Sequence, residues 1–243
     1  MADSSDLAGL LDRPRGGSVV AGARPLPAAN ASPAKGARAR KRDPERTSAA
    51  ILEAATQEFS QKGYAGARVD AIAKRAKINK RMLYHYFGGK DGLYLSVLEH
   101  IYAAIRSAET KLDLAHHEPV ESMRQLVHFT WSYYLERPEF LAILATEIQH
   151  RAKFLKQSDR IVQLNSPLIT AIREVLAHGA AQKVFRDDVD PVELYISIAA
   201  LGAFYLSNRW TLSTIFRRDL MASEALETWG EHIADMVMAS LKR

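Results

Sequence analysis

The sequence predicts an all-α protein. From Asp43 onward, apolar residues recur at intervals of three and four along most of the chain, which is the spacing of one helix face. Capping residues and prolines stand where these stretches begin, and no alternating strand pattern lasts long enough to count. The chain has 243 residues, 47% apolar and 25% charged, which is the composition of a globular protein with one large or two small domains.

The first half of the helical region carries clear start and stop signals. Asp43 and Asn79 are good N-caps, Pro44 suits a first helical turn, and Gly88-Gly89 stop a helix. Helices are therefore expected over four ranges: Pro44 to Gly63, Arg68 to Lys77, Lys80 to Phe87, and about Lys90 to Lys111.

The second half continues the pattern to the C-terminus. Pro119 and Pro138 each stand where a helix begins, and Pro167 starts or kinks another helix that runs to Gly179. Asp190-Pro191 opens an apolar helix to about Ser207, and the last helix covers roughly Ser223 to Leu241. Eight to ten helices are expected in all.

The positive charge is concentrated at the N-terminal end of the chain. Residues 1–42 hold eight Lys/Arg against three Asp, residues 43–91 carry a net charge of +3, and residues 92–243 a net charge of −3. Residues 1–42 are also rich in Ala, Gly, Pro and Ser, so we expect a disordered basic tail. Such a tail serves either as a solubilising segment or as an arm along a DNA groove.

Two short helices joined by a tight turn, the second one cationic, predict a helix-turn-helix DNA-binding unit. Residues 68–81 hold six Lys/Arg and one acid, and Leu83 and Phe87 share the side expected to be buried. Tyr86 remains open between core and surface. Phosphates attract cations and tyrosine hydroxyls, and an arginine can also bond one guanine in two places. The candidate DNA contacts on the second helix are Lys80, Arg81, Met82, Tyr84 and His85.

Other chemistry finds little support in the sequence. There are no metalloprotease, hydrolase or dinucleotide-binding fingerprints, and no cysteine, so we expect no enzyme, metal site or cofactor. The N-terminus is acidic without an apolar segment after it, and the longest apolar run, Tyr195 to Leu206, is too short to cross a bilayer. We expect a cytoplasmic protein without membrane contact.

The stretch "ILEAATQEFSQKGYAGARVDAIAKRAKINKRMLYHYFGGKDGLYLSVL" resembles the DNA-binding domain of the TetR/AcrR family of bacterial regulators. The shared features are "A…F…GY", "IA…A", "LYHYF" and "F-x-x-K-x-x-L". Lys77 stands where the family most often has a turn glycine, Asn79 where it has serine, and Arg68 where it often has a small hydroxyl residue. The resemblance adds Arg68, Lys77, Asn79 and Lys90 to the candidate DNA contacts.

The resemblance implies a domain division and a mechanism. It implies a helix-turn-helix domain at 43–92 and a C-terminal ligand-binding and dimerisation domain at 93–243. Family members are homodimers, joined by a four-helix interface, that leave a palindromic DNA operator when a small molecule binds. The all-round apolar helix that contains Tyr195 to Leu206 independently favours a dimer, because each of its sides needs cover.

The effector is predicted only loosely. Rings and polar groups recur in the middle helices, which is the mixture that pockets offer. The candidates are His128, Trp131, Tyr134, Glu147, His150, Phe154 and Asn165, although rings at helical spacing also form ordinary core. Their ring content favours a small aromatic or heteroaromatic effector. The function expected is a ligand-responsive repressor, and the alternative is an architectural protein that binds DNA without sequence preference.

Overall fold

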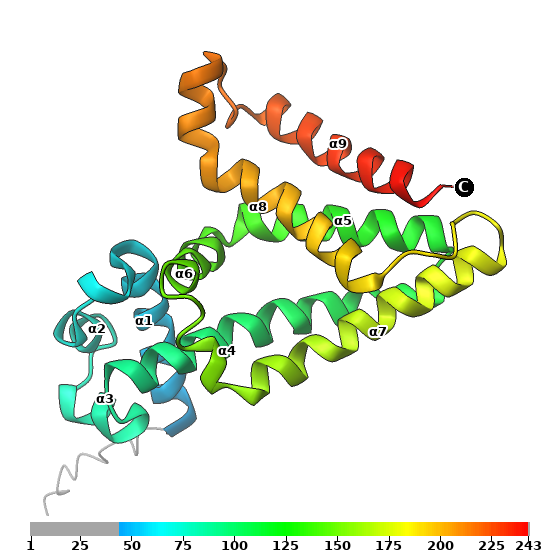
Figure 1. Cartoon of the computed structure of the whole chain (residues 1–243). Helices are drawn as coiled ribbons and strands as arrows, with labels where there is room; N and C mark the ends of the chain where they lie inside the picture. Colours follow the sequence, from blue (N-terminus) through cyan, green and yellow to red (C-terminus); the bar gives the residue numbers. More distant parts are fainter. Residues whose placement is uncertain (1–43, 243) are drawn as a thin grey trace, which may run out of the picture. The chain divides into compact units, whose positions relative to one another are not determined.

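The computed structural model describes residues 44–242, and this part of the chain is built of α-helices and short 3-10 turns with no strand, so the all-α prediction is confirmed (Figure 1). The α-helices are α1 (Pro44–Gly66), α2 (Val69–Arg75), α3 (Lys80–Phe87), α4 (Lys90–Glu109), α5 (Pro119–Glu136), α6 (Pro138–Gln149), α7 (Asp159–Ala181), α8 (Pro191–Phe216) and α9 (Ser223–Leu241). The 3-10 turns are η1 (Thr110–Leu112), η2 (Leu114–His116) and η3 (Leu155–Gln157). The predicted basic tail, residues 1–42, lies outside the described residues.

Helices α1, α2 and α3 form a small unit, called here the head, that packs against the start of α4 (Figure 1). Its core side chains are apolar residues that recur at helical spacing along each helix. Ile51, Phe59, Ile72 and Leu83 are all completely buried. Fully burying such side chains stabilises the fold by about 1.5–3 kcal/mol each, so the short helices α2 and α3 are held by tertiary packing.

The turn between α2 and α3 is a Schellman motif. The amide of Ile78 donates to the carbonyl of Ala73 (3.0 Å), and the amide of Lys77 donates to the carbonyl of Lys74 (3.2 Å). This pattern needs a left-handed residue just after the helix, and Lys77 has a φ of 54°. Lys77 therefore adopts the conformation for which glycine, the residue that the family resemblance leads one to expect, is best suited.

The start of α4 fits closely against the end of α3. A Cβ on Gly92 would lie 2.1 Å from the carbonyl oxygen of Phe87, so only glycine allows this approach. Gly88, with a φ of 71°, ends α3 in the left-handed region. These two glycines fix the corner at which the chain leaves α3 and enters the helix that leads into the rest of the molecule.

The remaining helices, α4 to α9, form the body. Helix α5 packs against α7, α8 and α9, α4 packs against α7, and α6 packs against α1 of the head. Asp190 caps α8 by accepting from the amides of Val192 (2.8 Å) and Glu193 (2.9 Å), as the sequence predicted. None of the helices in residues 44–242 is long and apolar enough to cross a membrane.

Three helix boundaries differ from their predictions or refine them. Gly63 breaks the helical conformation as expected, but α1 resumes for three residues beyond it. Pro167 lies inside α7, which begins at Asp159 and carries its own cap at Ser158. Helix α8 continues past Ser207 to Phe216, because no glycine or proline interrupts residues 208–216.

The left-handed Lys77 yields a stability prediction. Replacing Lys77 by glycine should raise the free energy of unfolding by about 0.5–1 kcal/mol. The left-handed region costs a residue with a Cβ about 1–2 kcal/mol, and the greater freedom of glycine in the unfolded chain offsets roughly 0.5–1 kcal/mol of that gain. Urea denaturation measures the change. Lys77→Ala is the control, since it removes the same charge but keeps a Cβ; an equal gain in both variants would show that the charge, not the backbone, is responsible.

Candidate functional site

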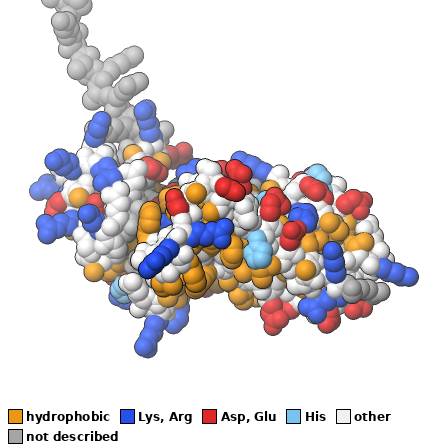
Figure 2. Space-filling view, turned by 90° about the horizontal axis from the view of Figure 1, so that it is seen from above, with side chains coloured by type: hydrophobic (Ala, Val, Ile, Leu, Met, Phe, Trp, Pro, Cys, Tyr) orange, Lys and Arg blue, Asp and Glu red, His pale blue; other side chains and the backbone are white. Residues whose placement is uncertain are grey.

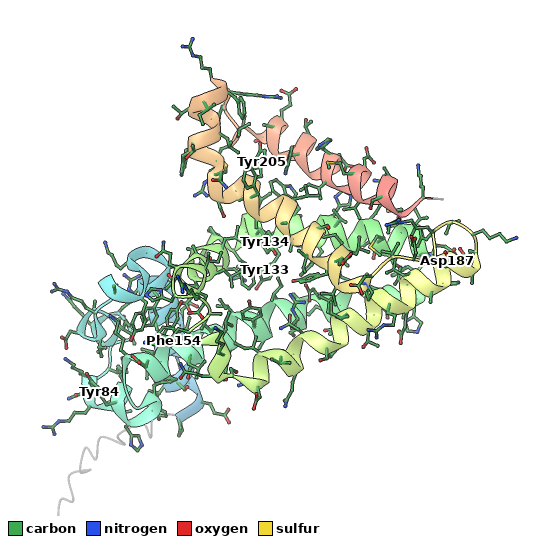
Figure 3. All side chains as sticks on the ribbon, viewed as in Figure 1. Tyr84, Tyr133, Tyr134, Phe154, Asp187 and Tyr205 are labelled. Atoms are coloured by element: carbon green, nitrogen blue, oxygen red, sulfur yellow. The ribbon has the colours of Figure 1, made fainter. Side chains whose placement is uncertain are left out.

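The outer side of α3 presents a polar and cationic surface. Asn79 caps the helix by accepting from the amide of Arg81 (2.9 Å), and the completely buried Leu83 anchors the opposite side. Lys80, Arg81, Tyr84 and His85 are exposed, and we call these four residues the α3 surface. Figure 3 shows Tyr84 at the outer side of the head, away from the body.

The other predicted DNA contacts lie around this surface with varying exposure. Arg68, Lys77 and Asn79 are exposed, whereas Met82 is half-buried rather than facing outward. Tyr86 is also half-buried and packs against the core. Figure 2 shows Lys and Arg gathered at the end of the described chain that carries the head, whereas acids and bases are mixed over the rest of the visible face.

Two of the predicted cations already have partners in the free protein. The Lys80 ammonium lies 2.8 Å from Asp70 on α2, and this contact raises the pKa of Lys80. Lys90 lies over the ring of Tyr64, 4.8 Å from its centre, and donates to the carbonyl of Ala65 (3.3 Å). Lys80 is thus held beside α2, while Lys90 is turned toward α1 and must leave Tyr64 to reach a phosphate.

An aromatic cluster joins the head to the body. Phe59 and Tyr64 of the head meet Tyr94 of α4 and Phe154 of the body, with ring centres 4.7 to 4.9 Å apart for the closest pairs. Tyr64 also hydrogen-bonds the Asp91 carboxylate at the start of α4, and burial together with Asp91 raises the pKa of Tyr64 to about 12. We call these four rings the junction cluster; Figure 3 shows Phe154 where head and body meet.

The body contains a cavity of about 680 Å³ between the second half of α4, the turns η1 and η2, and α7. We call it the α4–α7 cavity. Its apolar lining includes Leu114, Leu164, Pro167 and Leu168. Four charged residues also line it: Arg106, Glu109, Asp113 and Arg160. A mostly apolar concave wall with a few charged groups is typical of small-molecule sites.

Arg106 and Glu109 form a buried charged pair beside this cavity. Their side chains are 6% and 3% exposed, and the Arg106 Nη1 lies 3.0 Å from the Glu109 Oε2. The pair is poorly aligned, since Nε and Nη1 of Arg106 and both carboxylate oxygens of Glu109 have no hydrogen-bond partner among the described residues. The remaining nitrogen, Nη2, donates to the hydroxyl of Tyr195 on α8 (2.7 Å). Burial raises the pKa of Glu109 to about 7, although the Arg106 charge acts in the opposite direction.

The seven predicted effector residues are not gathered around one cavity, and none of them lines the α4–α7 cavity. His128 and Trp131 line a shallow hollow beside α9, where His128 lies 3.8 Å from Glu231. Tyr134 lies deep in the body near Tyr133 and stacks on Phe140 (Figure 3). Asn165, on α7, donates to the carbonyl of Ile161 one turn earlier.

The other three candidates lie near the head. Glu147 is buried and accepts from the amides of Phe154 (3.2 Å) and Leu155 (3.0 Å), so it caps the turn η3. Phe154 belongs to the junction cluster, and His150 bonds the carbonyl of Thr146 (2.8 Å). These three residues lie where the head and the body pack together, and they do not line the α4–α7 cavity.

Sequence reasoning missed Arg106 and Glu109. A signal was present, because an arginine and a glutamate three positions apart border the apolar stripe of Val97, Ile101 and Ile105 on α4. The spacing alone does not separate a buried pair from a surface one. The packing of other helices over this part of α4, α7 and α8 among them, makes the pair buried.

Helix α8 carries exposed apolar side chains on one side. Val192, Ile196, Phe204 and Trp210 are 45% to 67% exposed, and at 100° per residue they fall within about 120° of one another. We call these four residues the α8 face. The view in Figure 2 shows hydrophobic side chains between the charged ones of the body.

Comparison with known proteins agrees with this architecture. Residues 51–97 match the family model for bacterial regulatory proteins of the tetR family, and residues 119–237 match that for the tetracyclin repressor-like C-terminal domain. The transcriptional repressor NicS of Pseudomonas putida is 41% identical over 208 residues, which are 86% of this chain and 97% of NicS. The transcriptional repressor SCO4008 of Streptomyces coelicolor is 41% identical over 164 residues, 66% of this chain and 79% of that protein.

A solved structure shows the same fold at low sequence identity. The transcriptional regulator FadR of Bacillus subtilis, solved in complex with stearoyl-CoA, superposes with a TM-score of 0.61 at 15% identity, covering 79% of this chain and 98% of FadR. The family resemblance is therefore confirmed, as are the helix-turn-helix domain and the helical C-terminal domain. The chain belongs to the TetR family of bacterial transcriptional regulators, which are DNA-binding proteins and not enzymes.

Proposed function

We propose that this protein is a repressor that binds a palindromic DNA operator as a homodimer and leaves it when a small molecule enters the body. The observation that carries the proposal is the α3 surface, a capped helix with exposed cationic and aromatic side chains at the outer side of the head. NicS and SCO4008, which cover most of this chain, are both named repressors.

The α3 surface suits the major groove of DNA. A recognition helix directs its N-terminal residues to base edges, and Arg81 is the second residue of α3. An arginine there reads a guanine through two hydrogen bonds. Lys80 and Tyr84 suit phosphate oxygens on either side, and His85 and the half-buried Met82 complete the contact. Arg68, Lys77, Asn79 and Lys90 are proposed as phosphate contacts from the flanking turns.

The α8 face supports a homodimer. A monomer gains nothing from exposing Ile196, Phe204 and Trp210 together on one helix, and such apolar patches mark protein interfaces. A second copy of the chain offers the same face. Pairing of the two copies about a two-fold axis at α8 and α9 would bury the α8 face of each copy against the other. We propose the domain division that follows from this assignment: a DNA-binding domain at 43–92 and a ligand-binding and dimerisation domain at 93–243.

The α4–α7 cavity supports control by a small molecule. Its volume of about 680 Å³ lies within the usual range of small-molecule sites. FadR, which shares the fold, was solved with stearoyl-CoA bound. Helix α4 lines the cavity at Arg106 and meets the head at Tyr94, so a ligand that displaces α4 also shifts the head. Release requires only that the ligand bind the DNA-incompetent arrangement better than the other.

Selection of bound sites from random DNA tests the proposal directly. A palindrome with half-sites one helical turn apart, or a multiple of that, is expected for a two-fold dimer of recognition helices. Binding without a preferred site, together with a steep dependence on salt, would instead indicate an architectural DNA-binding protein and contradict the repressor assignment.

Base reading and phosphate contact predict different effects on α3. Arg81→Ala should weaken operator binding by about 1–3 kcal/mol and relax the preference at one base position, because a bidentate contact is lost. Lys80→Ala should weaken binding to all sequences and reduce the salt slope by about one, because one phosphate contact is lost. Fluorescence anisotropy on operator and random DNA at several salt concentrations measures both. Equal losses on both DNAs for Arg81→Ala would refute its base-reading role.

The α8 face predicts the assembly state. Phe204→Glu should convert the dimer into a folded monomer that no longer holds the full palindrome, because Phe204 is 62% exposed and its charge would be buried against the second copy. Sedimentation gives the mass, and circular dichroism verifies the fold.

The matched control for the interface is Val162→Glu, which places the same charge on a similarly exposed residue of α7 (68%). This variant should remain a dimer with unchanged operator affinity. A wild-type monomer at micromolar concentration, or a dimeric Phe204→Glu variant, would exclude the α8 face as the interface.

A further inference from the structure

We propose that the α4–α7 cavity takes a small organic acid, whose carboxylate binds the buried Arg106 guanidinium in place of Glu109. This inference rests on the proposed function, because it names the chemical class of the effector for the cavity described above. It is independent of how the head reads DNA, and it is tested separately.

Arg106 carries a buried positive charge whose hydrogen-bond donors are mostly without a partner among the described residues. A guanidinium stays charged inside a protein, and a buried charge is costly unless it is paired and hydrogen-bonded. Arg106 is only 5% exposed, yet its Nε and Nη1 have no hydrogen-bond partner among the described residues. The single hydrogen bond from its Nη2 to Tyr195 leaves most of its donors free. A ligand acceptor at the cavity wall would satisfy them.

Glu109, the carboxylate that faces Arg106 within the protein, is a poor partner for it. Glu109 lies 3.0 Å from Arg106, but neither of its carboxylate oxygens accepts a hydrogen bond. Burial makes its charged form costly and raises its pKa to about 7. A ligand carboxylate that approaches Nε and Nη1 of Arg106 directly can accept the hydrogen bonds that Glu109 does not, and these bonds favour its charged form. It can therefore replace Glu109 beside Arg106, while Glu109 takes up a proton and becomes a donor.

The charges that line the α4–α7 cavity also favour an anionic ligand. The lining carries two cations, Arg106 and Arg160, and two acids, Glu109 and Asp113. Once Glu109 is protonated, the wall carries two cations and one acid, and this net charge of +1 suits one negative charge better than a phosphate dianion. The apolar lining by Leu114, Leu164 and Leu168 suits a hydrocarbon or aromatic body on the ligand.

The exchange predicts that acid binding takes up a proton. The titratable and charged groups around Glu109 are Arg106 on its own helix, Asp113 beyond η1, Tyr133 and Tyr134 on α5, Arg160 on α7, and Tyr195 on α8. The tyrosines stay neutral near pH 7, because burial raises the pKa of each of them. His116 on η2 is a second titratable group near the cavity, because its Nδ1 lies 2.5 Å from Asp113 and this contact raises its pKa, but its side chain is exposed. Glu109 is the buried group expected to take up the proton, and the affinity for an acid should fall by up to about tenfold per pH unit above pH 7.

The experiment compares acids with amides of the same shape. The probes are benzoate, 2-naphthoate and octanoate, each paired with benzamide, 2-naphthamide or octanamide, titrated into the full-length protein by calorimetry at pH 6 and pH 8. At least one acid should bind about tenfold to a hundredfold more tightly than its amide, since a charged acceptor strengthens the hydrogen bonds to Arg106. Buffers of different ionisation enthalpy should reveal proton uptake at pH 8 and little at pH 6.

Three variants test which residue causes the preference for an acid over its amide. Arg106→Gln should abolish the preference for acid over amide. Arg160→Gln, the control on the same cavity wall, should keep it, because the Arg160 side chain is 63% exposed and already contacts Glu99. Glu109→Gln should still bind the acid but without the pH dependence. If Arg106→Gln fails to fold, the pH and proton-uptake measurements on the unmodified protein still decide.

Several results would overturn the assignment. They are the absence of binding by all three acids at millimolar concentration, equal affinity for acid and amide, no proton uptake at pH 8, or loss of the preference in Arg160→Gln. Operator binding measured without any acid separates this failure from failure of the proposed function. A protein that binds its palindrome but no acid refutes only the ligand class, and one that binds acid through Arg106 but no palindrome supports the site and refutes the repressor assignment.

Discussion

The burial of both ends of α4, one against the head and one inside the body, is the constraint on which the rest of the structure depends. Its first turns bury Leu93, Tyr94 and Val97 where α4 packs against α1 and α3, whereas its last turns carry Ile105 and Arg106 into the body. A helix is stiff over this length, and sixteen residues separate Lys90 from Arg106, which is roughly 24 Å at 1.5 Å per residue. Neither end of α4 can move far without a response at the other end.

The two ends of α4 are held by unlike interactions. At the head, the junction cluster and the hydrogen bond from Tyr64 to Asp91 give close ring packing that resists gradual deformation. In the body, the poorly satisfied Arg106–Glu109 pair leaves free energy available to an incoming partner. In the proposed function, the closely packed end of α4 transmits a movement to the head, and the incompletely satisfied end responds to the ligand.

Local features of the molecule followed from sequence, and long-range ones did not. Asn79 and Asp190 act as the caps that the sequence indicated, because a cap depends only on neighbouring residues. The sequence leaves open whether Pro167 starts a helix or lies inside one, because the tolerance of a proline inside α7 depends on tertiary packing. The proposed DNA contacts remain predictions, although the structure exposes most of them on or beside α3.

The cavity shows most clearly why sequence reasoning stopped short. Rings such as Trp131 and Phe154 were chosen for their chemistry, yet they pack into the core. A helix pattern alone does not say whether another helix covers the Arg106–Glu109 pair on α4. Burial of Arg106 arises from α7 and α8, which lie more than fifty residues further along the chain. Such a site is a property of the packed body, not of any one segment.

In the proposed function, α4 links the occupancy of the cavity to the spacing of the two heads of the dimer. Because the chain has no cysteine, Gln61→Cys on the exposed side of α1 places one spin label on each head of the dimer. Pulsed electron paramagnetic resonance then gives the head-to-head distance with selected operator DNA, and after addition of an acid that binds the cavity. One narrow distance is expected on DNA and a different one with the acid, in the labelled protein with Arg106 but not in its Arg106→Gln variant. An unchanged distance when the acid is bound and the DNA released would contradict it.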